Sequence, residues 1–156
     1  MADLYAEAYA ERLHRRFESV AAFRQRLETH VRKPGFRLVG LMANGDIIAD
    51  AYGFEVVTPE TWWGDQVPDW VPEEVNGGTL FAVCEMMVRP AWRRQGHARS
   101  LHSELLAGSR TDFALLFVRK DNTSARRAYE RWGYRQIGSH QPEFDAPDFD
   151  VMLLRR

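Results

Sequence analysis

The sequence has few of the features that mark several large protein classes. Cys84 is the only cysteine among the 156 residues, so no disulfide can form within the chain and no thiol-rich metal site is available. The five histidines show no close ligand spacing, and we therefore expect no structural metal. No apolar run approaches the roughly 20 residues that a membrane-spanning helix needs, which predicts a protein without membrane contacts.

Basic residues are not in excess either. The chain has 21 basic and 22 acidic side chains and a formal net charge of -1, whereas a nucleic-acid binder usually carries a basic surplus. The amphipathic first residues include acidic ones from Asp3 onward, unlike a secretion signal, so a cytoplasmic protein is the simplest interpretation. The length and the 45% share of hydrophobic residues fit a single globular domain over residues 1–156.

Apolar residues recur at helical spacing over residues 4–13 and again over 20–31, which predicts two consecutive helices. Ser19 is a suitable N-cap for the second helix, and Pro34-Gly35 follows its end. Asn44-Gly45 is a strong signal for a two-residue hairpin turn. We therefore expect a hairpin of two strands over residues 36–42 and 46–57.

From residue 79 the pattern changes to strand, helix, strand, helix, strand, strand. Residues 80–88 and 113–118 are almost continuously apolar, as is typical of buried central strands. A helix is expected between them, and such a βαβ connection makes the two strands parallel neighbours. The remaining elements are expected over residues 96–108 and 122–132 as helices and over 134–139 and 149–154 as strands.

Residues 58–78 differ in kind, because they combine three prolines, three glycines, three tryptophans and five acidic residues. A loop of this length inside a compact domain is usually functional or mobile, and we expect no regular strand in it. Aromatic faces and carboxylates suit a cationic amine. Trp62, Trp63 and Trp70 are therefore candidates for binding an acceptor, although they can equally serve to cover the core.

The most informative stretch is VRPAWRRQGHARSL, residues 88–101. A buried strand ends there, Pro90 interrupts its pairing, and basic residues lead to Gly96 at the start of a helix. The first amide groups of a helix lack internal partners and carry partial positive charge, so the turn suits an anion such as a pyrophosphate. The stretch is neither a Walker P-loop nor a G-x-G-x-x-G dinucleotide fingerprint.

Two motifs carry a family resemblance. Residues 93–98 fit the pattern [Q/R]-x-x-G-x-[G/A], and DNTSARRAYERWGY fits N-x-x-A-x-x-x-Y-x-x-x-G-[FY] from Asn122 to Tyr134. In this order, on a strand-to-helix turn and on a later helix, they resemble the GNAT superfamily of acyl-CoA-dependent N-acyltransferases. The resemblance extends from about Leu80 to the C-terminus.

The resemblance implies an α/β fold of the GNAT type. Such a fold has a mixed, mostly antiparallel sheet with a central pair of parallel, splayed strands, flanked by about four helices. The coenzyme-binding core would span about residues 80–140, and the acceptor-side loop about 58–78. The family usually starts with a strand before its first two helices. Here that strand is either absent or formed by a partly extended MADLYAEAY.

The resemblance also implies the cosubstrate, acetyl-CoA, and its contacts. The strand before the turn would pair with the pantetheine arm, after a bulge within residues 80–88, and the turn would bind the pyrophosphate. Asn122 would bond the arm or help to hold the splayed strands apart, and Tyr129 would lie near the sulfur. The implied coenzyme-binding residues are Met86, Met87, Val88, Arg93, Arg94, Gln95, Gly96, His97, Ala98, Asn122 and Tyr129.

The implied chemistry is direct attack of an amine on the thioester, which requires a base because a protonated amine has no lone pair. Glu85 is the only carboxylate within LFAVCEMMV and is our candidate base, acting directly or through water. Tyr129 is our candidate acid for the departing thiolate. Cys84 as an acyl-carrying nucleophile is disfavoured, because strand alternation points it away from Glu85 and a buried cysteine is usually packing.

Structural roles remain open for each of these residues. Glu85 can be paired with an arginine, Tyr129 can pack against Trp132, Asn122 can be a helix cap, and the pair Arg93-Arg94 can form a solvated turn. His97 is expected to contribute its backbone and not its ring.

The main alternative function is a GNAT-fold module that binds acyl-CoA or a ligand without turnover. Nucleic-acid binding through RRQGHARS is disfavoured by the net charge. The sequence leaves open which amine is the acceptor, which acyl chain is preferred, and whether the chain forms a homodimer.

Overall fold

The computed structural model describes residues 1–57, 68–69, 71–142 and 146–156. Trp62, Trp63 and Trp70, the predicted acceptor-binding residues, lie outside the described part of the chain. The chain divides into two units. The first consists of Met1–Phe54 and Cys84–Ser109, and the second of Glu55–Val83 and Arg110–Arg156.

The first unit contains the N-terminal helices, the hairpin and the turn singled out above. Its elements are α1 (Ala2–Ala8), the 3-10 helices Ala10–Arg12 and Arg16–Glu18, α2 (Val20–His30), β1 (Arg37–Ala43), most of β2 (Asp46–Val56), the end of β3 (Leu80–Val88), the 3-10 helix Pro90–Trp92 and α5 (His97–Ala107). The predicted hairpin turn is present, with positive φ angles of 53° at Asn44 and 86° at Gly45, as a type I′ turn requires.

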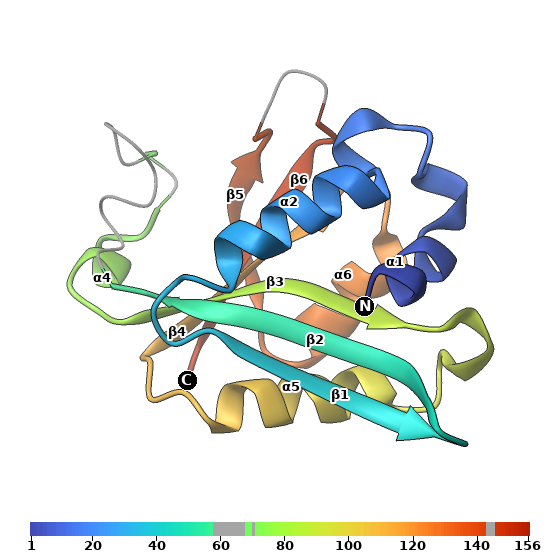
Figure 1. Ribbon diagram of the computed structural model, residues 1–156. Coiled ribbons are helices and arrows are strands. Elements are labelled where there is room, and N and C mark those ends of the chain that lie inside the picture. The colour runs from blue at the N-terminus through green and yellow to red at the C-terminus, as the bar shows by residue number, and fades with distance from the viewer. Residues whose placement is uncertain (58–67, 70, 143–145) are drawn as a thin grey trace. The chain divides into compact units, whose positions relative to one another are not determined.

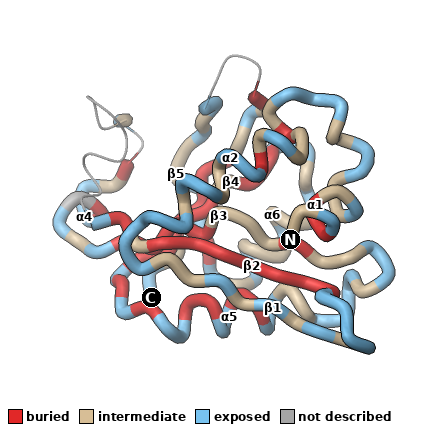
Figure 2. Tube along the Cα trace, viewed as in Figure 1, coloured by how far each residue is buried: buried red, intermediate tan, exposed pale blue. Residues whose placement is uncertain are grey.

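The core of the first unit packs α1 and α2 against the sheet. Leu4 and Tyr5 of α1, Phe23 of α2, Tyr52 of β2 and Met87 of β3 form one cluster, and each is at most 3% exposed. Helix α5 lies on the opposite side of the β1–β2 hairpin (Figure 1). Buried positions run without a break along much of β2 (Figure 2), because it is covered on both faces.

The second unit contains α4 (Glu73–Asn76), the start of β3, β4 (Phe113–Arg119), α6 (Thr123–Arg131), β5 (Arg135–His140) and β6 (Phe149–Arg155). Strand β6 pairs antiparallel with β4 on one side and with β5 on the other. The buried carboxylate of Asp150 on β6 accepts hydrogen bonds from Arg126 at 3.1 Å and from Gln136 at 2.9 Å. These two donors satisfy a charge that would otherwise be costly to bury.

The strand order is β1-β2-β3-β4-β6-β5. Strands β3 and β4 are parallel, in register from Leu80 with Phe113 to Val83 with Leu116, as the βαβ pattern predicts. The pairs β1–β2, β4–β6 and β5–β6 are antiparallel, and β2 runs opposite to β3 (Figure 1). The predicted mixed, mostly antiparallel sheet with one parallel pair is therefore confirmed.

Three details differ from the sequence-based expectation. Helix α1 ends at Ala8, well before residue 13, because Tyr9 leaves the helical region with φ of -121° and ψ of 25°. The described part of the long loop includes the short helix α4, so the described residues contain five α-helices where about four were expected. Residues 1–36 contain no strand. The segment MADLYAEAY is therefore not extended, and its residues Ala2–Ala8 form α1.

Ser19 performs the predicted capping of α2. Its hydroxyl accepts a hydrogen bond from the Ala22 amide at 3.2 Å and donates one to the Arg16 carbonyl at 2.8 Å. We expect Ser19→Ala to lower the free energy of unfolding by about 1 kcal/mol, measured by urea denaturation. Ser103→Ala, at an exposed position inside α5, should leave it unchanged or slightly higher. Equal values for the two variants would contradict the capping role.

Candidate functional site

The turn between β3 and α5 has an unusual backbone. It passes from Val88 through the 3-10 helix Pro90–Trp92 and then adopts positive φ angles twice, 61° at Arg94 and 87° at Gly96. A positive φ at a non-glycine residue such as Arg94 is uncommon and often occurs at functional sites. Turns of this kind gather amide groups into a concave anion-binding surface.

Gly96 is the N-cap of α5, and among the described residues no side chain caps this helix. The amide of Ser100 donates to the Gly96 carbonyl at 3.1 Å as the helix starts, while the amides before it have no intrahelical acceptor. A Cβ placed on Gly96 would meet nothing within 4 Å. The start of α5 therefore offers open amide groups and the positive end of the helix dipole to an anion.

The two arginines of the turn are used differently. Arg93 donates from Nε to the Val88 carbonyl at 3.1 Å and from Nη2 to the Ala8 carbonyl at 2.8 Å. It thereby ties the turn to the end of β3 and to the end of α1. Both arginines are exposed, but the Arg93 guanidinium is already bonded to two carbonyl groups, so Arg94 is the better placed to meet a ligand phosphate.

The remaining residues of the turn support this geometry. Gln95 donates from Nε2 to the Ala91 carbonyl at 3.2 Å, which closes the turn. The His97 ring lies 5.9 Å from the Trp92 ring, between centroids. Its Nε2 is buried and has no hydrogen-bond partner among the described residues. The ring was expected to have no role, and nothing in the sequence marked this orphaned nitrogen. Ala98 follows in the first turn of α5 and adds little bulk.

Met86, Met87 and Val88 form the end of β3 that leads to the turn. Met87 is 1% exposed and belongs to the core cluster, whereas its two neighbours are partly buried. Cys84 packs against the same cluster as Met87, although residues three apart on a regular strand point to opposite faces. This arrangement favours the predicted irregularity between residues 84 and 87.

Glu85 lies on β3 and is partly buried. The hydroxyl of Tyr9 donates to its Oε1 at 3.0 Å, although the two residues are 76 positions apart. Tyr9 is the first residue after α1, so the early end of that helix brings the phenol toward β3. The sequence analysis did not identify Tyr9. Its only signal was a tyrosine in an apolar helical stripe, which is usually core packing.

The Tyr9 ring that reaches this carboxylate is held by further aromatic contacts. Tyr5 contacts Tyr9 edge to face, with centroids 4.8 Å apart, and stacks on Phe23 at 4.2 Å. Arg26 of α2 is held by the Phe17 carbonyl at 2.7 Å and lies over the Phe17 ring. Its positive charge therefore acts on Glu85 from a fixed position.

Burial raises the pKa of Glu85 to about 7, because an ionised carboxylate is poorly solvated inside the protein. The charge of Arg26 and the hydrogen bond from Tyr9 oppose this rise, while the charges of Asp50 and Glu18 add to it. A carboxyl group with a pKa near 7 can accept and release protons at neutral pH. Glu85 therefore has the electrostatic environment of a general base.

Asp50 is a second buried carboxyl group of this unit and was not identified from the sequence. It lies on β2 and is 2% exposed. Burial raises its pKa to about 6, against the opposing charge of the Met1 amino group. It occupies an ordinary-looking position in IIADAYGF, and only the fold reveals that it points inward.

Cys84 is a free, partly buried thiol. Burial raises its pKa, and the negative charge of Glu85 raises it further. The reactive thiolate is therefore disfavoured, which agrees with a packing role for this residue.

Asn122 and Tyr129 belong to the second unit. The Asn122 side chain accepts a hydrogen bond from the Ala125 amide at 3.2 Å and so caps α6. The Tyr129 ring contacts Trp132 and Tyr134 edge to face, at 5.3 and 5.8 Å between centroids. The structural roles left open for both residues are thus present, and any role toward a ligand would be additional to them.

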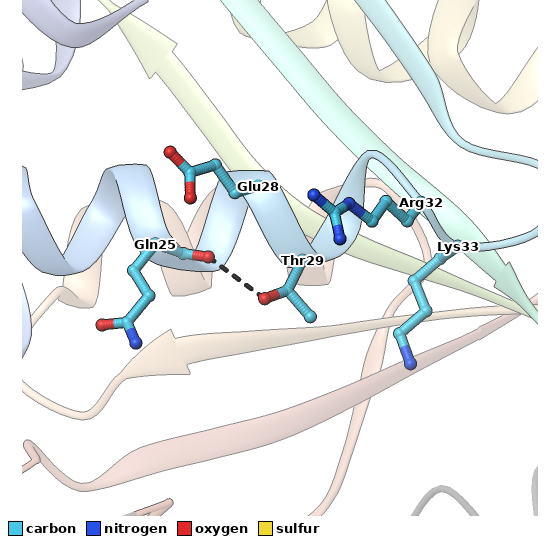
Figure 3. A pocket seen from close by; sticks show the side chains of 5 residues that line it. All are labelled: Gln25, Glu28, Thr29, Arg32 and Lys33. Atoms are coloured by element: carbon cyan, nitrogen blue, oxygen red, sulfur yellow. Dashed lines mark hydrogen bonds between the residues drawn. The ribbon is translucent and has the colours of Figure 1, made fainter.

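A shallow hollow of about 380 Å³ lies along α2 and is lined by Gln25, Glu28, Thr29, Arg32 and Lys33 (Figure 3). Side chains of both charges border it, and Thr29 donates to the Gln25 carbonyl at 3.1 Å. None of the residues predicted to form the site lines this hollow.

The described residues contain neither a candidate metal site nor a candidate membrane-spanning helix. In residues 1–57, 68–69, 71–142 and 146–156, no group of three or more His, Cys, Asp or Glu side chains is placed to hold a metal ion. No helix within the same ranges has the length and apolar character needed to cross a membrane.

The raised pKa of Asp50 predicts a pH-dependent stability. The folded protein holds the proton of Asp50 to higher pH than the unfolded chain does, so this group stabilises the fold most at low pH. The contribution is lost as pH rises from about 4 through about 6. The rise of the Asp50 pKa from 3.8 to about 6 corresponds to roughly 3 kcal/mol in the free energy of unfolding.

We therefore expect the free energy of unfolding of the parent, relative to Asp50→Asn, to fall as the pH is raised from 4 to 7, in urea titrations at each pH. Asp46→Asn removes a charge from the exposed start of the same strand and serves as the control. A parent-to-Asp50→Asn difference that does not change with pH would contradict the burial effect.

Comparison with known proteins finds a family that is similar to part of this chain. Residues 74–149 match the model of a family described as an acetyltransferase (GNAT) domain. An uncharacterised protein of Mycobacterium leprae (strain TN) is 34% identical over 76 residues, which are 49% of this chain and 21% of that protein. The chain thus matches about a fifth of the length of this curated relative.

Solved structures share the fold. A protein of Pyrococcus horikoshii OT3 has a TM-score of 0.70 and 18% identity, covering 99% of this chain and 87% of its own. A GNAT family acetyltransferase of Elizabethkingia anophelis, solved with acetyl-CoA bound, has a TM-score of 0.60 and 11% identity, covering 85% of this chain and 82% of its own. Residues 74–149 are thus similar to the acetyltransferase (GNAT) domain family, and the fold shared with these solved structures extends over most of the chain.

Proposed function

We propose that the chain transfers an acetyl group from acetyl-CoA to a primary amine within a ternary complex. The observation that carries the proposal is the order of features along β3 and α5. A carboxyl group with a pKa near 7 is followed, eleven residues on, by a helix start with open amides and two positive φ angles. A base and an anion-binding turn on one continuous segment suit a phosphate-bearing acyl donor and a proton-releasing acceptor.

The donor would bind through the backbone first. The open amides at the start of α5 would hold its pyrophosphate, with Arg94 adding charge from the exposed side. Arg93 would contribute mainly by shaping the turn, because its guanidinium already bonds two carbonyl groups. The main chain of Met86 to Val88 would follow the pantetheine arm, and the family pattern assigns Asn122 to the same arm. Acetyl-CoA in the Elizabethkingia anophelis relative supports this choice of donor.

The reaction requires one net proton to leave when the acceptor begins as an ammonium ion. Glu85 takes a proton from the nitrogen, directly or through water, and the neutral amine attacks the thioester carbonyl. A C–N bond forms and the C–S bond breaks. The thiolate takes a proton from Tyr129, the proposed donor, and the second nitrogen proton, lost as the amide forms, restores the Tyr129 hydroxyl. The one net proton released is therefore the proton held by Glu85. Backbone amides near Met86 and Met87 are the proposed donors to the developing oxyanion.

Tyr9 tunes this base and does not replace it. Its hydroxyl stabilises the ionised form of Glu85, so it holds the pKa below the value that burial alone would produce. The identity of the amine is not specified by these groups. The negative charges of Glu85, Asp50 and Glu18 favour an acceptor that arrives with a positive charge.

Binding of the donor can be tested at the helix start without endangering the fold. We expect Ala98→Glu to weaken acetyl-CoA binding at least about tenfold, because like charges brought together cost more than 1.4 kcal/mol. A glutamate in the first turn stabilises a helix, so lost binding would not reflect unfolding. Titration calorimetry measures the affinity, and Ala107→Glu at the exposed far end of α5 is the control. Unchanged binding in Ala98→Glu would overturn the assignment of the turn.

Turnover can be tested with a panel of amines and acetyl-CoA, following release of free thiol. We expect Glu85→Gln to lower kcat by roughly 10²- to 10⁴-fold, with little change in the affinity for acetyl-CoA. Glu104→Gln, on the exposed face of α5, should behave as the parent. Donor binding without turnover of any amine would favour the alternative, a GNAT-fold module that only binds its ligand.

The hydrogen bond from Tyr9 predicts a shift of the pH profile. Removing it in Tyr9→Phe raises the pKa of Glu85, because the bond lowers that pKa in the parent. The acidic limb of kcat/KM, expected near pH 7 in the parent, should therefore move to higher pH, while activity at alkaline pH is largely kept. A limb that stays in place or moves to lower pH would show that Glu85 is not the titrating base.

A further inference from the structure

Asp50 is buried without a hydrogen-bond partner. Its side chain is 2% exposed, and neither carboxylate oxygen is bonded to any group among the described residues. A buried carboxylate in this condition is costly, and unsatisfied buried polar groups in native proteins usually have a functional reason or an ordered water as partner. Nothing in the core of the first unit requires a carboxylate at this position.

The strand next to Asp50 has no side chain beside it. Gly40 of β1 is the register partner of Asp50, and partners in an antiparallel pair point to the same face. Gly40 is exposed, and a Cβ built on it would meet only the Ala49 carbonyl, at 3.7 Å. A side chain would therefore fit at this position, yet none is present. No side chain therefore covers this position on the face of β1 that Asp50 shares.

Asp50 also interacts with the proposed base. Strand β3 lies beside β2, where the Arg89 amide donates to the Ile48 carbonyl at 2.9 Å. The two carboxyl groups lie on neighbouring strands, and the charge of Asp50 contributes to the raised pKa of Glu85. The other charges acting on this pair are those of Arg26, Glu18 and the Met1 amino group.

We propose that Asp50 is a positioning residue that holds a buried water and passes the proton of the reaction from Glu85 to solvent beside Gly40. This inference rests on the proposed function. The proton leaves the amine nitrogen for a Glu85 oxygen and then crosses the water to Asp50. It leaves Asp50 through water beside Gly40, which regenerates both carboxylates. One proton leaves per acetyl group transferred, as the reaction requires.

A water fits this position better than the acceptor itself does. An ammonium group on a substrate would need to reach a side chain that is 2% exposed, whereas a water needs only a small opening and a few polar partners. The two possibilities differ in kinetics. Loss of a relay lowers kcat, while loss of an ammonium site raises the KM for the amine.

The first test compares Asp50→Asn with Asp46→Asn, using the amine that the parent acetylates best. We expect Asp50→Asn to lower kcat about tenfold or more, with the KM for acetyl-CoA unchanged. The acidic limb of kcat/KM should move to lower pH, because the variant loses a negative charge that raises the pKa of Glu85. Asp46→Asn should match the parent. An unchanged kcat, or a change only in the KM for the amine, would overturn the relay.

The second test covers the position at Gly40 and leaves both carboxyl groups in place. Gly40→Val suits a strand position with room for a Cβ, so it should fold, as checked by circular dichroism and thermal unfolding. We expect it to lower kcat severalfold, while Ala43→Val on the opposite face of the same strand has no effect. If Asp50→Asn fails to fold, this variant decides the question, and full activity in Gly40→Val would overturn the proposed exit.

A third measurement separates the relay from the proposed function. Carbon-13 NMR titration of the Glu85 and Asp50 carboxyl groups needs no substrate, and the pKa of Glu85 should be lower in Asp50→Asn than in the parent. A parent that acetylates no amine would refute the proposed function and the relay with it. If the parent and Asp50→Asn acetylate the amine equally fast, and the pKa of Glu85 is the same in both, the relay alone is refuted.

Discussion

The burial of a carboxyl group on β3 is the constraint on which the first unit is built. Glu85 is tolerated there because a phenol hydroxyl from the end of α1 and a guanidinium charge from α2 offset part of its desolvation. Both helices are in turn held to the strand by the cluster of Leu4, Tyr5, Phe23, Tyr52 and Met87. The N-terminal helices therefore do more than cover the sheet, because they help to set the pKa of the proposed base.

The turn before α5 also depends on how its polar groups are bonded. Its amides are left open at the helix start, while the side chains around them bond to the main chain. Arg93 joins the turn to the end of α1 through the Ala8 carbonyl, and Tyr9, the next residue, reaches Glu85. The turn proposed to bind the anion and the proposed base are thus linked through one short stretch of backbone.

Much of the fold could be predicted from the sequence because its signals are local. Continuous apolar runs marked β3 and β4, Asn44-Gly45 marked the hairpin, and Ser19 marked the start of α2. The turn at Gly96 was predictable for the same reason. Tyr9 and Asp50 were not, since their roles arise from contacts across long sequence separations, and a tyrosine in an apolar stripe resembles core packing. The early end of α1, on which the reach of Tyr9 depends, was also missed.

The two carboxyl groups on neighbouring strands lower the stability of the fold, although the proposed chemistry uses both. Each raises the cost of ionising the other, as the effect of Asp50 on Glu85 indicates, and apolar residues at both places would pack without that cost. In the proposed relay, however, the base passes its proton to a second acceptor after every turnover. That acceptor is useful only if its pKa is close to the pKa of the base. Burial raises the pKa values of both groups to near neutral pH. The destabilising environment of Asp50 is then the condition that lets a proton move in either direction between them.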